Sequence, residues 1–537
     1  MMTSRRQSTP LICQGGDRVP ETLASYVAGG WFTPSGGDGA VATDAVTGEA
    51  VARLSTAGLD MRSVVDHARR SGGPALRAMT FQERAAALKA LATHLDSKKE
   101  AYYELSFSTG ATRRDSAVDI DGGIGTTFAY SSIGKRELPD DTLLVDGDAV
   151  PLGKQGIFAG RHFYTPKRGV ALQINAFNFP VWGMLEKLAP AVLAGVPSIV
   201  KPATQTAYVT AAVVRDIVDS GTLPEGALQL VCGSVSELLD LLGGEDVIAF
   251  TGSAHTAAVL RRHNAVTARG AHFNAETDSL NASILGLDAG PDSDEFALFV
   301  KEVAREMTVK AGQKCTAIRR AFVPQQYLDD AISALRARLD RVVVGNPRSE
   351  SVTMGALVSL PQREEVRSSV HELEHAGEIV AGDAEKVDPV DADPQRGAFM
   401  SSVLLLARDP ERQETHTVEA FGPVSSVIPY RTIDEVVDLA ARGEGSLVGS
   451  IVSHDPDFVR GVVLGTAPYH GRLLVLDRDS AAESTTHGTV MPQLVHGGPG
   501  RAGGGEELGG VRAVKHYMQR TALQGSPDVL GAVLGKS

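Results

Sequence analysis

The sequence predicts an α/β protein built on mostly parallel sheets. Its middle third alternates short apolar runs with helical stretches, at 169–174, 182–194, 198–202 and 207–220, and residues 285–480 give a second series of the same kind. Strands that alternate with helices are joined by right-handed crossovers, which set successive strands parallel in one sheet. A chain of 537 residues is long enough for two to four domains with large cores.

The charge balance limits the kinds of partner. The chain has 52 Lys and Arg residues against 65 Asp and Glu residues, a net charge of −13. This acidic balance disfavours general binding to nucleic acid or to an anionic membrane surface. No apolar run approaches the roughly 20 residues that a membrane span needs. We therefore expect no nucleic-acid partner and no membrane association.

The cysteines and the N-terminus indicate the compartment. Cys13, Cys232 and Cys315 are far apart and match neither a disulfide framework nor a zinc spacing, so we expect a reducing cytoplasm. A pair of arginines near the N-terminus is not followed by the apolar core of an export signal. Residues 1–20 are expected to form a loose polar tail.

The first third of the chain predicts short strands and long helices. Residues 26–31 indicate a strand and turn, and 43–49 indicate the corner of a hairpin. Leucines at spacings of three and four predict helix over 60–99. A further helical stretch covers 116–130, and residues 140–170 predict a hairpin or an extended arm.

Polar side chains follow three strands of the middle third. Asn175 and Asn178 come after the first strand, Lys201 ends the second, and residues 251–253 end a later one. Ligands of parallel α/β sheets bind beyond the carboxyl ends of the strands. The three clusters together therefore predict a ligand site at one edge of the sheet. The glycine spacing of phosphate-binding loops is absent, so a dinucleotide site here would be atypical.

Cys315 lies in a polar joint between a helical stretch and the strand-like run 321–323. A cysteine at such a joint can be reached by a substrate. A thiol is a good nucleophile only as thiolate, and nearby cations or a helix terminus lower its pKa. Four basic residues are close in sequence: Lys310, Lys314, Arg319 and Arg320. The alternative is an inert, partly buried cysteine, the commoner role of a free thiol.

The second alternating series predicts its own helices and strands. Helical patterns cover 294–309, 328–340 and 361–376, and strands are predicted at 341–345, 402–406 and 516–523. Residues 494–510 are very rich in glycine.

A zinc-protease pattern occurs literally at 371–375, where His371 and His375 lie one helical turn apart. The surrounding helix is highly charged, and no third ligand can be named. We interpret it as a solvated helix face and expect no metal site. Cys232 ends an apolar strand and is expected to be structural.

Five segments in order carry a family resemblance: Asn-Phe-Pro at 178–180, Lys-Pro-Ala at 201–203, Phe-Thr-Gly-Ser at 250–253, Gly-Gln-Lys-Cys at 312–315 and Glu-Ala-Phe-Gly-Pro at 419–423. With them the chain resembles an aldehyde dehydrogenase from about residue 20 to 525. The resemblance implies an α/β aldehyde dehydrogenase fold with a Rossmann-like cofactor domain, a catalytic α/β domain and a small β oligomerisation arm.

The resemblance also implies how the chain is divided. We expect the cofactor domain at 21–152 and 170–280, the catalytic domain at 281–493, and the arm at 153–169 and 512–525. An arm of this kind implies a homodimer or a larger assembly.

Three residues then receive catalytic roles. Cys315 resembles the nucleophile that attacks the aldehyde carbonyl, and Asn178 resembles the oxyanion-hole residue that assists the Cys315 backbone N–H. Hydride would pass to the nicotinamide and leave a thioester. Glu276 resembles the residue that activates water for hydrolysis, although the usual Glu-Leu-Gly-Gly is Glu-Thr-Asp-Ser here. The alternative for Glu276 is a solvated glutamate in a loop.

The cofactor expectation rests on two positions. Lys201 resembles the lysine that holds the adenosine ribose or its phosphate. Thr204 stands where many NAD-preferring relatives carry a glutamate, and a hydroxyl can donate to the 2′-phosphate that a carboxylate repels. We therefore expect NADP, with NAD as the second option. The other cofactor-binding candidates are Asn175, Thr251, Gly252, Ser253, Glu419 and Phe421, with residues 251–253 near the pyrophosphate and the last two at the nicotinamide ribose and ring.

A finer similarity narrows the substrate. Segments 174–180, 312–320 and 496–510 look like the dehydrogenase part of the phenylacetate-degradation branch. That branch implies NADP-dependent oxidation of a CoA-linked aldehyde, 3-oxo-5,6-didehydrosuberyl-CoA semialdehyde. The alternatives are 3,4-didehydroadipyl-CoA semialdehyde, from aerobic benzoyl-CoA degradation, and a CoA-acylating reaction, which the presence of Glu276 disfavours.

Two further expectations follow from the branch. Glu506 and Glu507 are candidates for a second base, and their presence together with Glu276 favours the phenylacetate substrate. The two-domain relatives carry a hydratase after the dehydrogenase, whereas this sequence stops at Ser537. A separate hydratase is therefore expected as a partner.

Overall fold

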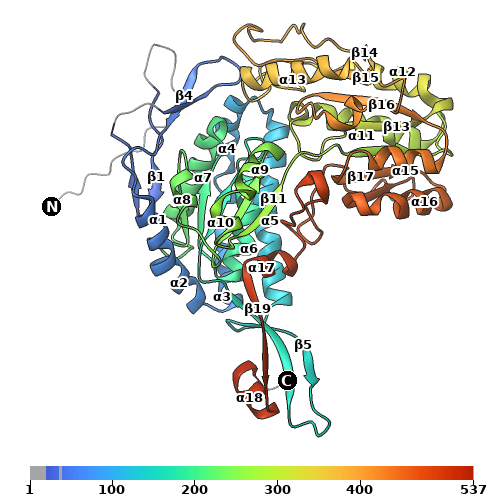
Figure 1. The fold of residues 1–537 in the computed structure, drawn as a ribbon. Helices are drawn as coiled ribbons and strands as arrows, with labels where there is room; N and C mark the ends of the chain where they lie inside the picture. The colour runs from blue at the N-terminus through green and yellow to red at the C-terminus, as the bar shows by residue number, and fades with distance from the viewer. Residues whose placement is uncertain (1–19, 36–38, 536–537) are drawn as a thin grey trace.

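The computed structural model describes residues 20–35 and 39–535 (Figure 1). The predicted tail, 1–20, lies outside the described residues apart from Pro20. Two seven-stranded sheets, each with helices, make up most of the molecule, and a third sheet of three strands projects from them. None of the helices in the described ranges is long and apolar enough to cross a membrane.

The first sheet has the order β11-β10-β7-β8-β9-β1-β2. Its parallel strands are β7 (Ala171–Ile174), β8 (Ser198–Lys201), β9 (Leu228–Leu230), β10 (Val247–Thr251) and β11 (His272–Glu276), and the antiparallel edge is β1 (Ser25–Val27) with β2 (Gly30–Phe32). The predicted, mostly parallel sheet is thus confirmed. A separate hairpin, β3 (Ala40–Thr43) with β4 (Ala50–Leu54), confirms the corner predicted at 43–49.

Helices cover both faces of this sheet. Neighbouring strand residues such as Leu172 and Ala171, or Ile199 and Val200, belong to different buried clusters, because successive side chains of a strand point to opposite faces. One face packs against α3 (Phe81–Asp96), α5 (Arg113–Glu137), α6 (Trp182–Ala194) and α7 (Ala207–Ser220); the other packs against α1 (Met61–His67), α8 (Ser236–Leu239), α9 (Ala254–Arg261) and α10 (Asn264–Thr267). Two further helices are α2 (Gly73–Ala78) and α4 (Lys99–Ser106).

The second sheet has the order β14-β15-β16-β13-β12-β17-β18. Its strands are β12 (Ala282–Leu285), β13 (Arg320–Pro324), β14 (Glu378–Ala381), β15 (Val403–Leu406), β16 (Val424–Tyr430), β17 (Ser446–Val452) and β18 (His470–Leu476), parallel except β14. The helices of this half are α11 (Asp294–Thr308), α12 (Leu328–Leu339), α13 (Leu360–Leu373), α14 (Glu414–Thr417), α15 (Ile433–Ala441) and α16 (Pro456–Thr466). α11 and α12 pack on one face and α15 and α16 on the other.

Two predicted strands need correction. Residues 341–345 form no strand; Val344 and Gly345 make only isolated bridges, to Met354 and Val390. Each of these contacts ends after a single bridge, so the short apolar run has no continuous partner strand. The last strand, β19 (Met518–Gly525), begins two residues later than predicted, because 516 ends the short helix α17 (Val511–His516).

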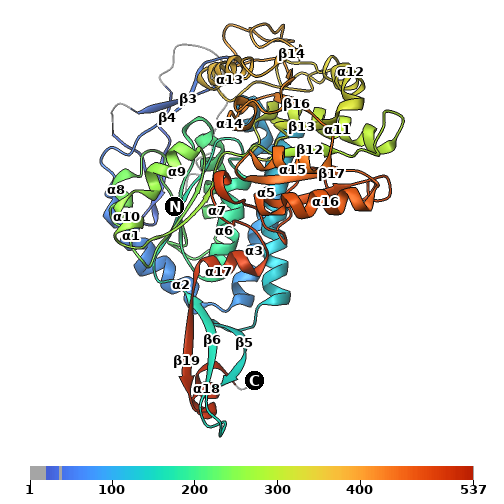
Figure 2. The ribbon, with the colours of Figure 1, turned by 45° about the vertical axis from the view of Figure 1, so that its right-hand side comes forward.

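The third sheet forms a projecting arm. β5 (Leu144–Pro151) and β6 (Ala159–Pro166) make the hairpin predicted at 140–170, and β19 from the end of the chain pairs with β6. Both views show the arm extending away from the large sheets, with α18 (Pro527–Leu534) beside it (Figure 2). β5 belongs to this sheet, although the division expected from the sequence placed residues up to 152 in the cofactor domain.

α5 joins the two loops that matter most for the site. Asp115 accepts a hydrogen bond from the backbone N–H of Lys310, at 2.8 Å, in the loop before Cys315. Asp119, one turn further on, accepts from the backbone N–H of Trp182 at the start of α6, also at 2.8 Å. Both carboxylates are buried. The helix therefore fixes segments of both large sheets relative to each other.

Replacing Asp119 by alanine should therefore lower the free energy of unfolding by about 2–4 kcal/mol, because buried N–H groups and the nearby Lys310 cation lose their partner. Urea unfolding followed by circular dichroism measures the change. Asp121→Ala is the matched control on the same helix; that side chain is 44% exposed, so its loss should stay within about 1 kcal/mol. Equal stability of the two variants would contradict the anchoring role of Asp119.

Candidate active site

A narrow pocket lies where the first sheet's carboxyl edge faces the loop of Cys315. It is lined by Val118, Ala176, Asn178, Phe179, Trp182, Gly183, Glu186, Thr251, Glu276, Cys315, Thr316, Gly488, Val490 and His496. Valine and aromatic side chains form its walls, and the polar groups gather around the thiol. The three residues expected to be catalytic, Cys315, Glu276 and Asn178, are thus brought into one pocket.

The loop before Cys315 has an unusual backbone. Lys310, Ala311 and Gly312 have φ values of 54°, 50° and 68°, three left-handed residues in succession. For a residue with a side chain this conformation costs on the order of 1–3 kcal/mol. Gly312 also passes so close to the Gly422 carbonyl that a Cβ would collide with it. The surrounding contacts therefore hold a strained loop that presents the cysteine.

The backbone on the other side of Cys315 is fixed by one amide. Asn281 donates from Nδ2 to the carbonyl oxygens of Cys315 at 2.8 Å and Ala317 at 2.9 Å. Asn281 itself is fully buried. The Cys315 side chain remains partly exposed, so the thiol faces the pocket while its peptide group is held rigidly.

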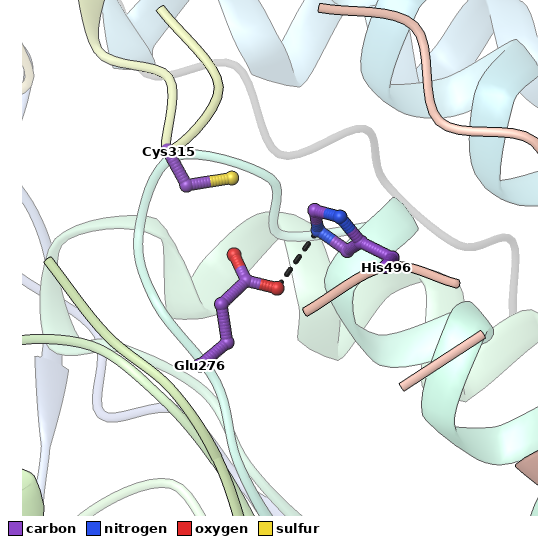
Figure 3. Close-up of side chains that lie close together, drawn as sticks. All are labelled: Glu276, Cys315 and His496. Atoms are coloured by element: carbon purple, nitrogen blue, oxygen red, sulfur yellow. Dashed lines mark ion pairs between the residues drawn. The ribbon is translucent and has the colours of Figure 1, made fainter. Parts of the chain in front are cut away.

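Glu276, Cys315 and His496 converge in this pocket (Figure 3). The ligand-type atoms of the three side chains all lie within 4.8 Å of one another. His496 Nε2 is 2.8 Å from Glu276 Oε2. Glu276 is 1% exposed and His496 is 5% exposed, so bulk water does not screen their pairing. Sulfur, oxygen and nitrogen donors this close could also hold a metal ion, although the sequence led us to expect no metal site.

The charges around the thiol differ from the sequence-based expectation. Lys314 is bound to Glu306, with Nζ–Oε2 at 2.7 Å, and Arg319 and Arg320 donate to backbone carbonyls. Burial, followed by the charge of Glu276, raises the pKa of the Cys315 thiol well above its ordinary value. The expectation that neighbouring cations would leave the thiol with a lowered pKa is therefore wrong, because burial and the charge of Glu276 outweigh the lowering effect of Lys314.

Glu276 is the acceptor in this arrangement. Burial alone would raise its pKa, but the ion pair with His496, helped by the Lys187 charge and the Cys315 thiol, outweighs burial and holds the pKa below its ordinary value. Burial in turn lowers the pKa of His496, and the Glu276 charge more than reverses this effect, so the net shift is upward. At neutral pH the pocket can therefore hold a thiol, a carboxylate and an imidazolium side by side.

The two candidates for a second base separate clearly. Glu507 is buried and lies 2.9 Å from Lys187 Nζ, and the Thr251 hydroxyl donates to it at 3.3 Å. Burial raises the pKa of Glu507. Neither glutamate is a pocket-lining residue, but Glu507 contacts the lining residue Thr251, whereas Glu506 pairs with Arg512. The structure brings Glu507 to the site and leaves Glu506 apart from it.

Most of the expected cofactor residues lie along the carboxyl edge of the first sheet. Asn175 follows β7, Lys201 ends β8, and Thr204 starts a short 3₁₀ turn after it. Ser253 caps α9, accepting from the Thr256 N–H. Thr251 and Gly252 join β10 to this cap, while Glu419 and Phe421 come from the second half of the chain, in the loop between α14 and β16.

Buried polar atoms in this cleft fit a dinucleotide. Both side-chain amide atoms of Asn175 and the Oε1 atom of Glu419 are buried without a hydrogen-bond partner among the described residues. Burial raises the pKa of Glu419 to about 7 despite the nearby Arg319. Phe421 stacks edge-on against Phe177, with ring centroids 5.8 Å apart. Ribose and amide groups could satisfy these orphaned atoms.

Sequence reasoning missed three residues that shape the pocket: Glu186, Lys187 and His496. Glu186 and Lys187 are adjacent charges inside an otherwise apolar helix, a pattern that could have marked them. His496 opens the glycine-rich run, and nothing local singled it out. In the histidine pattern at 371–375, both ring nitrogens of exposed His371 face carboxylates, those of Glu374 and Glu385.

Comparisons with known proteins agree with this geometry. The model of the aldehyde dehydrogenase family matches residues 31–522. A 3,4-dehydroadipyl-CoA semialdehyde dehydrogenase of Aromatoleum evansii is 46% identical over 479 residues, covering 89% of this chain and 93% of that protein. A non-phosphorylating aspartate-semialdehyde dehydrogenase of Halomonas elongata is 27% identical over 504 residues, covering 92% and 94%.

Solved structures show the same fold. The crystal structure of betaine aldehyde dehydrogenase from Staphylococcus aureus in complex with NAD⁺ superposes with a TM-score of 0.81, covering 94% of both chains at 22% identity. The family match spans both large sheets and reaches into the last strand of the arm. The chain therefore belongs to the aldehyde dehydrogenase family and is an NAD(P)-dependent oxidoreductase of that family.

Proposed function

We propose that the protein oxidises a CoA-linked semialdehyde to its carboxylic acid, with 3,4-dehydroadipyl-CoA semialdehyde as the preferred substrate. The observation that carries this is the 46% identity, along 89% of the chain, to the Aromatoleum evansii enzyme of that name. It favours the six-carbon substrate over the eight-carbon semialdehyde of phenylacetate degradation, which the sequence had put first. The aldehyde end would enter the narrow pocket, and the CoA end would stay outside.

The first half of the reaction forms a thioester on Cys315. The thiol proton passes to the Glu276 carboxylate as the sulfur attacks the aldehyde carbon, which gives a thiohemiacetal. The side-chain amide of Asn178 and the backbone N–H of Cys315 donate to the developing oxyanion. The nicotinamide cofactor, when bound, accepts the hydride. Trp182 and Phe179 exclude bulk water from this step.

The second half hydrolyses the thioester. Once Glu276 has released the thiol proton to solvent, its carboxylate takes a proton from a water molecule, whose oxygen attacks the thioester carbonyl carbon while the C–S bond breaks. The proton on Glu276 then returns to the thiolate, which restores the resting thiol and carboxylate. Glu507, held by Lys187 and hydrogen-bonded by Thr251, is the better placed of the two candidates for a second base. A CoA-acylating reaction would need no such base.

We propose NADP as the preferred cofactor. Lys201 makes no side-chain hydrogen bond or ion pair within the part of the chain that the structure describes, and burial lowers its pKa. Thr204, three residues on, places a hydroxyl rather than a carboxylate beside it. A cation and a hydroxyl suit a 2′-phosphate, and a glutamate at this position would repel it.

We also propose that the projecting arm mediates assembly into a dimer or a larger oligomer. Four large apolar side chains at its tip are exposed: Val150, Leu152, Ile157 and Phe158, by 44–68%. An apolar cluster of this kind is typical of an interface between subunits.

The two catalytic assignments are separable by kinetics. Cys315→Ala should lower aldehyde oxidation by about 10³-fold or more, because no thioester forms. Glu276→Gln should lower steady-state turnover by about 10²–10³-fold and slow the burst of reduced cofactor, because the acceptor of the thiol proton is lost; the burst should still approach one per active site, because hydrolysis without its base is slower than acylation. Stopped-flow absorbance at 340 nm measures both. Full steady-state activity of Glu276→Gln would contradict the assignment.

The cofactor preference is tested by equilibrium binding. Thr204→Glu should weaken NADP⁺ binding by about 10- to 100-fold through like-charge repulsion and leave NAD⁺ binding equal or tighter. Isothermal titration calorimetry gives both dissociation constants. Thr204→Ser, which keeps the hydroxyl, is the control and should resemble the wild type. Tighter binding of NAD⁺ than NADP⁺ by the wild type would overturn the proposal.

The substrate is tested by initial rates of cofactor reduction. The purified protein is offered the six-carbon and eight-carbon CoA-linked semialdehydes in parallel, and a simple aliphatic aldehyde as the control. We expect kcat/KM to be highest for the six-carbon compound. A preference for the eight-carbon compound would return the phenylacetate substrate to first place. Turnover of the simple aldehyde alone would exclude CoA-linked substrates.

A further inference from the structure

We propose that His496 is a positioning residue for Glu276, holding its carboxylate charged and directed at Cys315 throughout the reaction. The inference rests on the proposed thioester route, in which Glu276 serves as the base. It adds a residue from a distant loop to the reaction, and this residue touches the base rather than the substrate.

The geometry of the pair carries the proposal. His496 Nε2 lies 2.8 Å from Glu276 Oε2, and the three functional atoms of Cys315, Glu276 and His496 lie within 4.8 Å of one another. Figure 3 shows the imidazole on one side of the carboxylate and the thiol on the other. A contact on one oxygen leaves the other carboxylate oxygen free for the thiol or for water.

Glu276 needs such a partner because its surroundings are negative. Glu186 lines the pocket from α6, Glu507 is buried nearby on the glycine-rich loop, and the charges of both raise the pKa of His496. The nearby cation, Lys187, already binds these two carboxylates, at 3.3 Å and 2.9 Å. Among the described residues, His496 is the one cationic group within ion-pair distance of Glu276.

The loop that carries His496 is bound directly to the strand that carries Glu276. The Gly505 N–H donates to the Ala275 carbonyl at 3.1 Å, and the Thr277 N–H donates to the Ala502 carbonyl at 3.1 Å. The residues on either side of Glu276 are therefore both bonded to this loop. His496 itself accepts from the Glu507 N–H at 2.7 Å through its carbonyl. Imidazole and carboxylate thus move as one unit.

Close backbone packing explains the many glycines of the loop. Gly497 has a φ of 146° and makes a bridge with Glu506, and a Cβ on it would collide with the Gly505 carbonyl. Glycine is required where two backbones approach this closely. The loop therefore doubles back on itself, which sets His496 and Glu507 next to each other and close to the catalytic base, Glu276.

The expected pH dependence follows from the charge on the pair. The pKa of Glu276 is lowered in the presence of His496, so the carboxylate is ionised at neutral pH and loses its charge only in acid. Without the imidazolium, burial, the largest influence on that pKa, would raise it against the remaining lowering effects of the Lys187 charge and the Cys315 thiol. Protonated Glu276 cannot accept a proton from water, so the acidic limb of hydrolysis should move to higher pH.

Hydrolysis of p-nitrophenyl acetate isolates this step, because it passes through an acetyl thioester on Cys315 without hydride transfer or a CoA-linked substrate. The rapid phase of p-nitrophenol release reports acylation and the steady state reports deacylation, both followed from pH 5 to 9 at the isosbestic wavelength. His496→Gln keeps a neutral donor and removes the charge. His470→Gln, at a buried histidine on β18 that binds the Thr466 carbonyl, is the matched control.

His496→Gln should retain the amplitude of the rapid phase at a lower rate, because Glu276 also accepts the thiol proton. The rate of deacylation should fall by about 10-fold or more at pH 7 and recover in part as pH rises. The acidic limb of its pH profile for deacylation should shift to higher pH by about one unit or more. Adding His496→Gln to Glu276→Gln should change deacylation little, because the histidine acts through the glutamate. The His470→Gln control should follow the wild-type profile.

The outcomes separate the two claims. A wild-type protein with no rapid phase at Cys315 would contradict the proposed thioester route itself. A normal rapid phase in the wild type, with an unshifted acidic limb in His496→Gln, would overturn the role of His496 alone. If His496→Gln lowered the deacylation rate by the same factor at every pH, and by that factor again in the Glu276→Gln background, its role would be purely structural. That result would also overturn the positioning role.

Discussion

Two buried carboxylates one turn apart on α5 hold the active site together. Asp115 binds the backbone of the strained loop before Cys315, and Asp119 binds the first N–H groups of α6, next to Asn178. The nucleophile and the oxyanion amide come from different halves of the chain, so their distance depends on this shared helix. Gly123 lets α6 approach α5, since a Cβ there would lie 2.9 Å from the Trp182 backbone.

The electrostatics of the pocket keep the Cys315 thiol protonated until a base removes its proton, so no thiolate forms in advance. The carboxylates of Glu276 and Glu186 act on the Cys315 thiol and outweigh Lys314, which is paired with Glu306, while Arg319 donates to backbone carbonyls. A thiol held protonated is less open to oxidation and needs a proton acceptor at the moment of attack. The imidazole of His496 supplies the positive charge that keeps such an acceptor ionised.

The sequence predicted the parts of the site that depend on local pattern. Strand ends could be located from periodicity, so Asn175, Asn178 and Lys201 were correctly placed at one sheet edge. The pairing of His496 with Glu276 could not be predicted, because it depends on a loop that returns to β11 from far along the chain. The pKa of the Cys315 thiol was wrongly predicted for the same reason. Lys314 is next to Cys315 in the sequence, but in the structure it is paired with Glu306.

The position of the acyl group after one turnover tests the catalytic centre most directly. The Glu276→Gln protein is mixed with cofactor and the CoA-linked semialdehyde, quenched in acid, digested and mapped by mass spectrometry. The acyl group is expected on the peptide that contains Cys315, with Cys232 unmodified because that thiol is buried and its pKa is raised to about 12. An acyl group on any other residue, or none at all while cofactor is reduced, would contradict a thioester mechanism at Cys315.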